Sequence, residues 1–282
     1  MTEKTTVVIG GTGTTGRRVA AGLREKGAAV RVASRSGETR FDWTDPGTWQ
    51  AALDGADSAY IVPLDDAPSR TPALVEAAVK SGVARLVLLS ARGIDVPGYF
   101  AEGFTASALH LEGEQAVRAS GAAWTIVRPA WFAQNFSEGV FRDGLLAGEL
   151  ALPVGSGASA FVDADDIAAV AVAALTGPGH DGEVYELTGP RALTIAQVVD
   201  EIAGAAGPKA RYTPIEEDAF RAGLVAQGMS EAEAALWTEG LRPIRTSAEA
   251  RISDGVERAL GRAPRDFTEF ARAAAQAGAW RS

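Results

Sequence analysis

The sequence that decides the fold is Thr5-Thr6-Val7-Val8-Ile9-Gly10-Gly11-Thr12-Gly13-Thr14-Thr15-Gly16-Arg17-Arg18. It starts as an apolar, β-branched run, which is typical of a buried strand. Glycines follow at once, and the chain then takes on a helical pattern with Val19, Ala20 and Leu23 on one face. A strand, a glycine turn and a helix in this order form a phosphate-binding site. The helix N-terminus there presents free backbone N–H groups and the positive end of the helix dipole.

The glycines of this turn have distinct expected roles. Gly10, Gly13 and Gly16 allow a sharp turn, a close approach of the backbone to a pyrophosphate, and tight packing of helix against strand. The stretch therefore predicts a dinucleotide site, with a glycine-rich hairpin turn as the alternative. The residues expected to contact the cofactor here are Gly10, Thr12, Gly13, Thr14, Thr15 and Gly16.

Composition limits the classes of function that remain. The chain has 282 residues, 46% of them apolar, which suffices for one large α/β domain or for a domain with a smaller cap. The formal net charge of −9 argues against nucleic acid and membranes as partners, because phosphate contacts need clustered Lys and Arg. With no Cys and only 2 His, we expect neither a disulfide nor a metal site. No apolar run resembles a signal segment or a membrane span, so the expected location is the cytoplasm.

Strand and helix patterns alternate through the first half of the chain, which predicts an α/β fold with a doubly wound parallel sheet. We expect residues 1–155 to form a dinucleotide-binding domain, with its sheet completed by strands near 159–162 and 183–188. Residues 190–282 are expected to form a smaller, mainly helical substrate cap over the cofactor cleft. The alternative is that the amphipathic helices of this part are ordinary surface helices.

The second predicted strand, over residues 29–35, ends where the adenosine ribose of a bound dinucleotide lies. An acidic residue there would bind the 2′-hydroxyl of NAD, whereas an arginine suits the 2′-phosphate of NADP. Arg35, helped by Ser34, therefore predicts NADP(H), and an exposed surface arginine is the alternative. Asp42 is either a contact for the adenine amine or a plain turn-forming residue. Pro63 ends a further strand in the crevice where ligands bind.

Several motifs bear on the family. They are Gly10-Gly11-Thr12-Gly13-Thr14-Thr15-Gly16-Arg17, Leu88-Leu89-Ser90, His110-Leu111-Glu112-Gly113-Glu114, Thr125-Ile126-Val127-Arg128-Pro129, Asn135-Phe136, Val162-Asp163-Ala164-Asp165-Asp166, Tyr185-Glu186-Leu187-Thr188-Gly189-Pro190 and Gly261-Arg262-Ala263-Pro264. With them the sequence resembles the NmrA-like branch of the atypical short-chain dehydrogenases/reductases. The resemblance implies an NADP(H)-binding Rossmann fold. It also implies either a reductase, for example of quinones or secondary metabolites, or a redox-sensing regulator that binds NADP without turnover.

The sequence departs from the parent superfamily at its usual proton-donating pair, Tyr-x-x-x-Lys. Counted back from Glu114, Ala106 stands at the Tyr position and His110 at the Lys position. Reduction of a ketone normally uses an acid that protonates the developing alkoxide. Without the Tyr, two readings remain. Either another group donates the proton, or the substrate is an iminium ion, a quinone or a conjugated enone that needs little acid help.

Three residues are candidates for the chemistry. His110 can donate a proton near neutral pH or hold the nicotinamide ribose, and a helix-surface histidine is the alternative. Ser90 matches the active-site serine region of the family and is also expected to contact the cofactor, or it caps a backbone group. Tyr99 is a further donor candidate on a loop. The residues expected to line the substrate pocket are Tyr99, Phe104, Trp131, Phe132, Asn135, Phe136 and Trp237.

The first hypothesis is an NADPH-dependent reductase that transfers hydride to a small, fairly apolar organic substrate, with an activated C=C or C=N bond, a quinone or a ketone as the acceptor. The second is a non-catalytic, NADP(H)-sensing regulatory protein, and the third is a cofactor-bound enzyme with no net redox reaction. The sequence does not identify the substrate or the oligomeric state.

Overall fold

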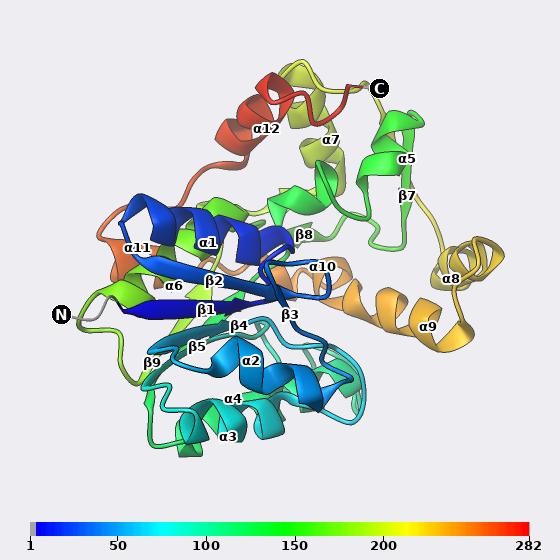
Figure 1. Cartoon of the computed structure of the whole chain (residues 1–282). Helices are drawn as coiled ribbons and strands as arrows, with labels where there is room; N and C mark the ends of the chain where they lie inside the picture. Colours follow the sequence, from blue (N-terminus) through cyan, green and yellow to red (C-terminus); the bar gives the residue numbers. More distant parts are fainter. Residues whose placement is uncertain (1–3, 282) are drawn as a thin grey trace.

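The computed structural model describes residues 4–281. Its centre is a seven-stranded parallel sheet with the order β3-β2-β1-β4-β5-β6-β9 (Figure 1). The strands are β1 (Thr5–Ile9), β2 (Ala29–Ser34), β3 (Thr39–Arg40), β4 (Ser58–Ile61), β5 (Arg85–Leu89), β6 (Ala123–Pro129) and β9 (Glu183–Leu187). The chain runs outward from β1 to β3, then returns past β1 and continues from β4 in the other direction. This order confirms the predicted doubly wound Rossmann topology.

Strand β1, which leads into the glycine turn, lies in the middle of the sheet. Its Val8 pairs with Val32 of β2 on one side and with Tyr60 of β4 on the other. Val7 and Val8 have no exposed surface, as expected for a parallel strand covered on both faces. Since the connections from β1 and β4 lead in opposite directions, a crevice opens between the carboxyl ends of these two strands.

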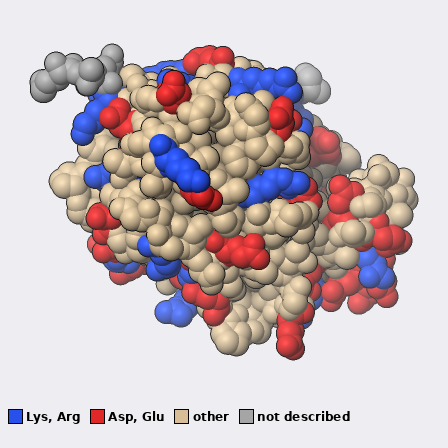
Figure 2. Space-filling view, turned by 60° about the horizontal axis from the view of Figure 1, so that its bottom comes forward, with Lys and Arg blue, Asp and Glu red and all other residues tan. Residues whose placement is uncertain are grey.

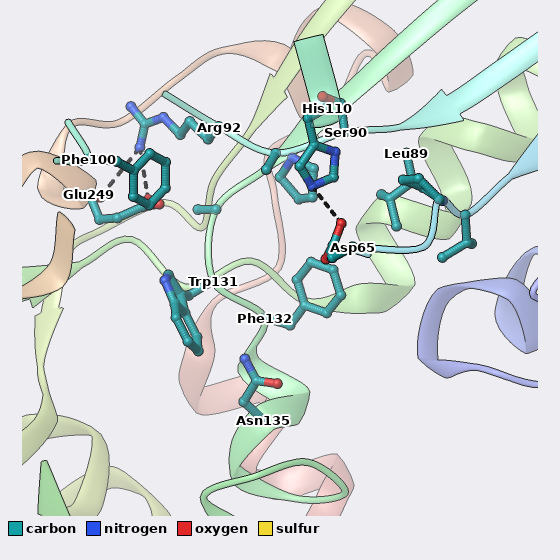
Figure 3. Close-up of a pocket in the computed structure, with 15 residues that line it drawn as sticks. Asp65, Leu89, Ser90, Arg92, Phe100, His110, Trp131, Phe132, Asn135 and Glu249 are labelled. Atoms are coloured by element: carbon teal, nitrogen blue, oxygen red, sulfur yellow. Dashed lines mark hydrogen bonds and ion pairs between the residues drawn. The ribbon is translucent and has the colours of Figure 1, made fainter. Parts of the chain in front are cut away.

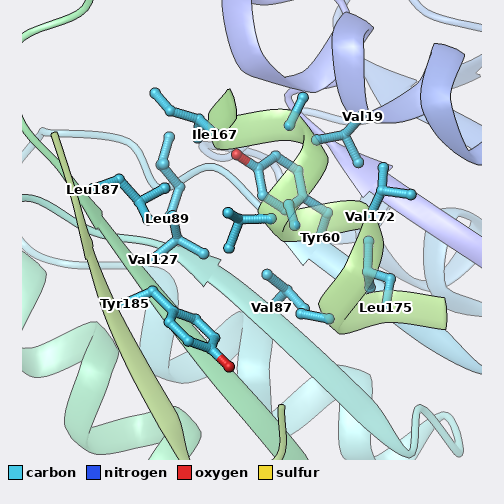
Figure 4. Close-up of a cluster of buried hydrophobic side chains, with 14 of the residues drawn as sticks. Val19, Tyr60, Val87, Leu89, Val127, Ile167, Val172, Leu175, Tyr185 and Leu187 are labelled. Carbon is cyan, nitrogen blue, oxygen red and sulfur yellow. The ribbon is translucent and has the colours of Figure 1, made fainter. Parts of the chain in front are cut away.

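Helices cover both faces of the sheet (Figure 1). One face carries α1 (Thr14–Glu25), α6 (Ala164–Thr176) and α11 (Gly255–Leu260), and the other carries α2 (Trp49–Leu53), preceded by the 3-10 turn η1 (Pro46–Thr48), α3 (Thr71–Lys80) and α4 (Thr105–Ala119). Each face has its own hydrophobic core. Figure 4 shows the first of these, where Val19 of α1, Tyr60 of β4 and Val172 of α6 come together.

A further hydrophobic core organises a smaller, mainly helical part of the chain. Around or beside it lie η2 (Ala133–Phe136), α5 (Arg142–Leu146), β7 (Glu149–Leu152), β8 (Ala158–Ser159), β10 (Leu193–Thr194), α7 (Ile195–Gly204), β11 (Arg211–Pro214), α8 (Glu217–Ala226), α9 (Glu231–Gly240), α10 (Arg242–Arg245), η3 (Ala248–Ala250) and α12 (Phe267–Gln276). Phe136, Phe161 and Phe267 meet at its centre, with ring centroids between 5.2 and 6.1 Å apart.

The topology tests the two late strands that the sequence predicted. The strand near 183–188 is β9, which completes the sheet beside β6. The strand near 159–162 does not join this sheet, because β8 pairs antiparallel with β10, and Val162 makes only an isolated bridge to Phe132. Phe161 packs in the core of the smaller part, and Val162 packs in the core around α1 and α6. This segment therefore passes from one part of the chain to the other.

The cores also depart from the predicted division into residues 1–155 and 190–282. Residues 133–154 already pack in the core of the smaller part. Conversely, α11 packs against α6 and β9 and belongs to the sheet domain. The chain thus passes between the two parts several times, and this arrangement lets late segments reach the ends of the central strands.

The surface matches the acidic composition. Figure 2 shows acidic side chains gathered on the lobe formed by α8 and α9, where Glu217, Asp218 and Glu231 are exposed. Such a lobe repels a polyanion. Within residues 4–281, no helix has the length and apolar character needed to cross a membrane.

Candidate functional site

The glycine turn after β1 forms a cradle of backbone N–H groups. Gly10 has a φ of +74°, in the left-handed region, and its N–H donates to the carbonyl of Ala33 at 2.9 Å. Helix α1 has Gly13 at its N-cap and therefore no side-chain cap. The first N–H group bonded within the helix is that of Arg17, which donates to the Gly13 carbonyl at 3.1 Å. The N–H groups of the first turn are left for a ligand.

The same turn has no space for a side chain. A Cβ atom on Gly16 would lie 2.3 Å from the carbonyl oxygen of Gly10. A Cβ atom on Gly11 would lie 2.9 Å from both Val32 Cγ1 and the carbonyl oxygen of Val8. Helix α1 therefore starts closer to the β1 backbone than any residue with a side chain allows. Such tight packing of helix on strand is what the last glycine of a dinucleotide-binding turn allows, so the residues present fit a dinucleotide.

The predicted adenosine end lies at the close of β2. Arg35 is exposed, and Glu38, three residues further on, is paired with Arg24 at 2.9 Å. The one acidic residue of this turn is therefore paired with another arginine, and Arg35 is left exposed to solvent. Ser34 is buried beneath the turn, and its hydroxyl accepts the N–H of Ser36 at 3.3 Å.

The side chain of Asp42 stabilises a turn, which is one of the two roles predicted for it. Its Oδ1 accepts hydrogen bonds from the N–H and the hydroxyl of Thr44 at 2.9 and 2.7 Å. These two hydrogen bonds lower the pKa of Asp42. The carboxylate thus closes its own turn, and contact with an adenine is a second role that stays a prediction.

A pocket of about 330 Å³ opens at the carboxyl ends of β4, β5 and β6 (Figure 3). Its polar lining consists of Asp65, Ser90, Arg92, His110, Asn135 and Glu249. Its apolar lining consists of Val62, Pro63, Leu89, Ala91, Phe100, Pro129, Ala130, Trp131 and Phe132. The pocket adjoins the glycine turn, because a Cβ atom on Gly10 would lie 2.9 Å from Val62 Cβ. It therefore stands in the crevice where doubly wound sheets bind their ligands.

His110 faces this pocket from α4, one helical turn after Ala106. Its Nε2 lies 3.2 Å from Oδ1 of Asp65, as Figure 3 shows. Its Nδ1 is buried and has no hydrogen-bond partner within residues 4–281. The side chain is only 11% exposed, which rules out the alternative of an exposed helix-surface histidine.

Ser90 joins a buried ionic network below the pocket. Its hydroxyl donates to Oε1 of Glu114 at 2.7 Å, and Glu114 receives two further 2.7 Å hydrogen bonds from Arg128. Arg128 in turn donates to Asp95 at 2.7 Å. Burial works against the charge of Glu114, but the hydrogen bonds from Arg128 and Ser90 outweigh it and lower its pKa. Glu114 is therefore a fixed carboxylate, and the Ser90 oxygen is oriented with its proton pointing away from a ligand.

The residues predicted to bind substrate fall into two groups. Trp131, Phe132 and Asn135 line the pocket. Trp237, on α9, has its ring centroid 6.4 Å from that of Trp131 and supports it from the smaller part of the chain. Phe136 instead has no exposed surface and lies in the core of that part. Its predicted contact with substrate is thereby corrected, because the 3-10 turn η2 aims it inward.

Tyr99 and Phe104 also lie outside the pocket lining. Tyr99 is buried, and burial together with the nearby Glu249 carboxylate raises the pKa of its hydroxyl. A more basic phenolate makes Tyr99 a poorer proton donor, which corrects its predicted role. Phe104 stacks on Phe100 with ring centroids 4.6 Å apart and borders a neighbouring cleft that also contains Arg242. Phe100 itself lines both cavities.

Sequence reasoning missed Asp65, Arg92 and Glu249 as pocket residues. Asp65 and Arg92 lie in the loops after β4 and β5, and their position near the carboxyl ends of parallel strands is a signal that points to them. Glu249 carries no such signal, because it lies in the short turn η3, far along the chain. The fold brings its buried carboxylate within 3.4 Å of Arg92.

Comparisons with known proteins agree with this geometry. A family model described as NAD(P)H-binding matches residues 10–178. The NAD(P)H azoreductase of Xenophilus azovorans is 35% identical, over 96% of this chain and 98% of its own. The structure of an Escherichia coli NADPH-dependent quinone oxidoreductase complexed with NADPH matches with a TM-score of 0.79 and 20% identity, over 94% of this chain and 98% of that one. NmrA, a negative transcriptional regulator, matches with a TM-score of 0.68 and 18% identity, over 96% and 95% of the two chains. At 20% and 18% identity, the likeness to these two solved structures demonstrates the shared fold alone.

Proposed function

The chain belongs to the NAD(P)H-binding family of atypical short-chain dehydrogenases/reductases, and we propose that it is an NADPH-dependent reductase of a small, fairly apolar organic substrate. The acceptor is an activated C=C or C=N bond, a quinone or a ketone. The observation that carries this proposal is the pocket beside the glycine turn, where an aromatic wall faces a few polar groups. A dinucleotide-binding crevice that continues into such a pocket suits a second, organic ligand.

The cofactor site is assembled from two positions of the chain. Backbone N–H groups at the start of α1 hold the pyrophosphate, and Arg35 holds the 2′-phosphate of the adenosine. The bound cofactor supplies a hydride. The protein binds and orients the acceptor and controls its proton.

The polar groups of the pocket have separate roles in this proposal. Ser90 offers an oxygen acceptor, because its own proton is held by Glu114. His110 and Asp65 form a pair at the side of the pocket, where the imidazole binds the ribose or an acceptor atom. Trp131 and Phe132 supply flat, apolar surface for an aromatic or conjugated substrate.

The test is oxidation of NADPH, followed by its nicotinamide absorbance, against a quinone, a conjugated enone, a cyclic imine and an aromatic ketone. Binding of NADPH is titrated in parallel. Turnover of any acceptor supports the proposal, and the acceptor that reacts identifies the bond class. Tight binding of NADPH without turnover of any of them would favour the regulatory alternative, to which the pocket beyond the dinucleotide site gives no support.

A further inference from the structure

One end of the pocket is formed by side chains from elements far apart in the sequence. Figure 3 shows Arg92, Phe100 and Glu249 together on one side, opposite Leu89, with His110 and Ser90 between. Arg92 Nη1 lies 3.4 Å from Glu249 Oε2, and Arg92 Nε lies 3.4 Å from Oε2 of Glu186. Arg92 and Glu249 are each 4% exposed in their side chains, and both line the pocket.

The other polar groups of the pocket are poorly suited to donate a proton. Ser90 already donates its proton to Glu114. Arg92 is an arginine, which keeps its protons at any pH that proteins experience. Asp65 is 55% exposed and is paired with Nε2 of His110. The other ring nitrogen of His110, Nδ1, is buried. Of the lining carboxyls, Glu249 alone is enclosed.

We propose that Glu249 is the catalytic acid of this pocket and replaces the missing tyrosine. This inference rests on the proposed reductase function. In a conjugated enone, the hydride forms a C–H bond at the β-carbon, and the π electrons move to the carbonyl oxygen. The O–H bond of Glu249 breaks, and its proton passes to that oxygen to give an enol, which tautomerises to the ketone. The enone is reduced, the nicotinamide is oxidised, and Glu249 takes up a proton from solvent after the product leaves.

The surroundings of Glu249 favour both states that this cycle needs. Burial raises the pKa of Glu249 to about 7, whereas Tyr99 and Arg92 act in the opposite direction and Glu186 adds to the rise. The carboxyl is therefore neutral in a large fraction of molecules at neutral pH, as an acid catalyst must be. Arg92, held at its side, stabilises the carboxylate that remains after transfer.

The test compares two acceptors in the Glu249→Gln variant. A neutral enone needs a proton, whereas a cationic triarylmethane dye becomes neutral on accepting hydride and needs none. We expect the kcat for the enone to fall by about 100-fold or more, the range in which general acids act. Glutamine keeps the shape of the side chain, but its amide does not act as an acid near neutral pH. Because the dye needs no proton, we expect its rate to stay within about twofold of wild type.

Glu186→Gln is the matched control. It removes the other carboxylate beside Arg92, but Glu186 does not line the pocket. It should leave the ratio of the two rates unchanged at acidic pH, where Glu249 is protonated, and move the pH profile with the enone to lower pH, because Glu186 adds to the rise in the pKa of Glu249. Glu249→Asp keeps the acid and should restore part of the activity with the enone.

Two further readouts do not depend on the preference for the dye. With the enone, wild-type kcat should fall as pH rises through about 7, and this dependence should be absent in Glu249→Gln. The infrared difference spectrum between cofactor-free wild type and Glu249→Gln should contain a protonated carboxyl band below that pH. NADPH affinity should be the same in both proteins.

Equal losses with both acceptors, or an unchanged rate with the enone, would overturn the assignment. So would the absence of the carboxyl band at acidic pH. If wild type reduces the enone but not the dye, the assignment of Glu249 is decided by the pH dependence of kcat with the enone in wild type and in Glu249→Gln. If wild type reduces neither acceptor nor any member of the first panel, the reductase proposal itself fails.

Discussion

Replacement of Gly16 by alanine is the most direct test of the cradle. The added Cβ would lie 2.3 Å from the carbonyl oxygen of Gly10, 2.8 Å from Gly11 Cα and 2.9 Å from Gly10 C. All three are backbone atoms, so no rotamer change relieves the clash. To reach an ordinary contact of 3.4 Å, the start of α1 must move outward by about 1 Å.

The rest of α1 resists this movement. Val19 and Leu23 of the helix have no exposed surface and pack in the core shared with α6. Overpacking of this kind costs about 1–3 kcal/mol. A shift of about 1 Å also weakens hydrogen bonds from the first turn to a charged ligand, each worth about 1.5–3 kcal/mol. Losing one of them raises Kd by about tenfold or more.

The assay has two parts, and Gly223→Ala is the control. Urea unfolding of the cofactor-free protein gives the change in stability, and NADPH fluorescence gives Kd. Gly223 lies within α8, and a Cβ atom there would have no neighbour within 4 Å. This substitution should stabilise the protein by about 0.5–1 kcal/mol and leave Kd unchanged. A Gly16→Ala variant with wild-type stability and wild-type Kd would refute the close-approach argument.

Three other predictions concern single side chains. Arg35→Ala should raise the KM for NADPH by about tenfold or more, since it removes a charged hydrogen bond, and leave that for NADH nearly unchanged; equal effects in steady-state assays would contradict NADP preference. His110→Ala should lower turnover with NADPH binding retained, and unchanged kcat would exclude it from the chemistry. Glu114→Gln leaves Arg128 without its buried partner and should cost about 3 kcal/mol in urea unfolding. Because the pKa of Glu114 is lowered in the folded protein, its contribution is present above the usual value of 4.5 and is lost as pH falls below it. A difference between wild type and variant that grows toward acidic pH would contradict this.

The cofactor half of the site could be predicted because its signals are local. A strand, a turn and a helix fall within about twenty consecutive residues, and the glycines that the turn requires for steric reasons are visible in the sequence. The capping boxes Thr194–Gln197 at the start of α7 and Ser230–Glu233 at the start of α9 have sequence signals of the same short-range kind. Asp163 likewise caps α6, because its side chain accepts the N–H of Asp165 only two residues later.

The substrate half depends on contacts that no short spacing encodes. Aromatic residues near the pocket look alike in the sequence, yet Phe132 lines the cavity and Phe136, one turn later, fills the core. The difference comes from the 3-10 turn η2, whose three-residue period a helical pattern does not anticipate. The place of Glu249 in the pocket is harder to predict from the sequence, because Glu249 is 157 residues away from its partner Arg92 along the chain.

Two buried arginine–glutamate pairs show why the state of a pocket residue follows from geometry and not from residue type. Glu114 accepts 2.7 Å hydrogen bonds from two nitrogens of Arg128 and another from Ser90, and its pKa is lowered. Glu249 has only 3.4 Å contacts with Arg92, which it shares with Glu186, and its pKa is raised. Short, bidentate hydrogen bonds compensate the loss of hydration, whereas long, shared ones do not. The first pair is therefore suited to hold the strand ends in place, and the second is free to exchange a proton with whatever occupies the pocket.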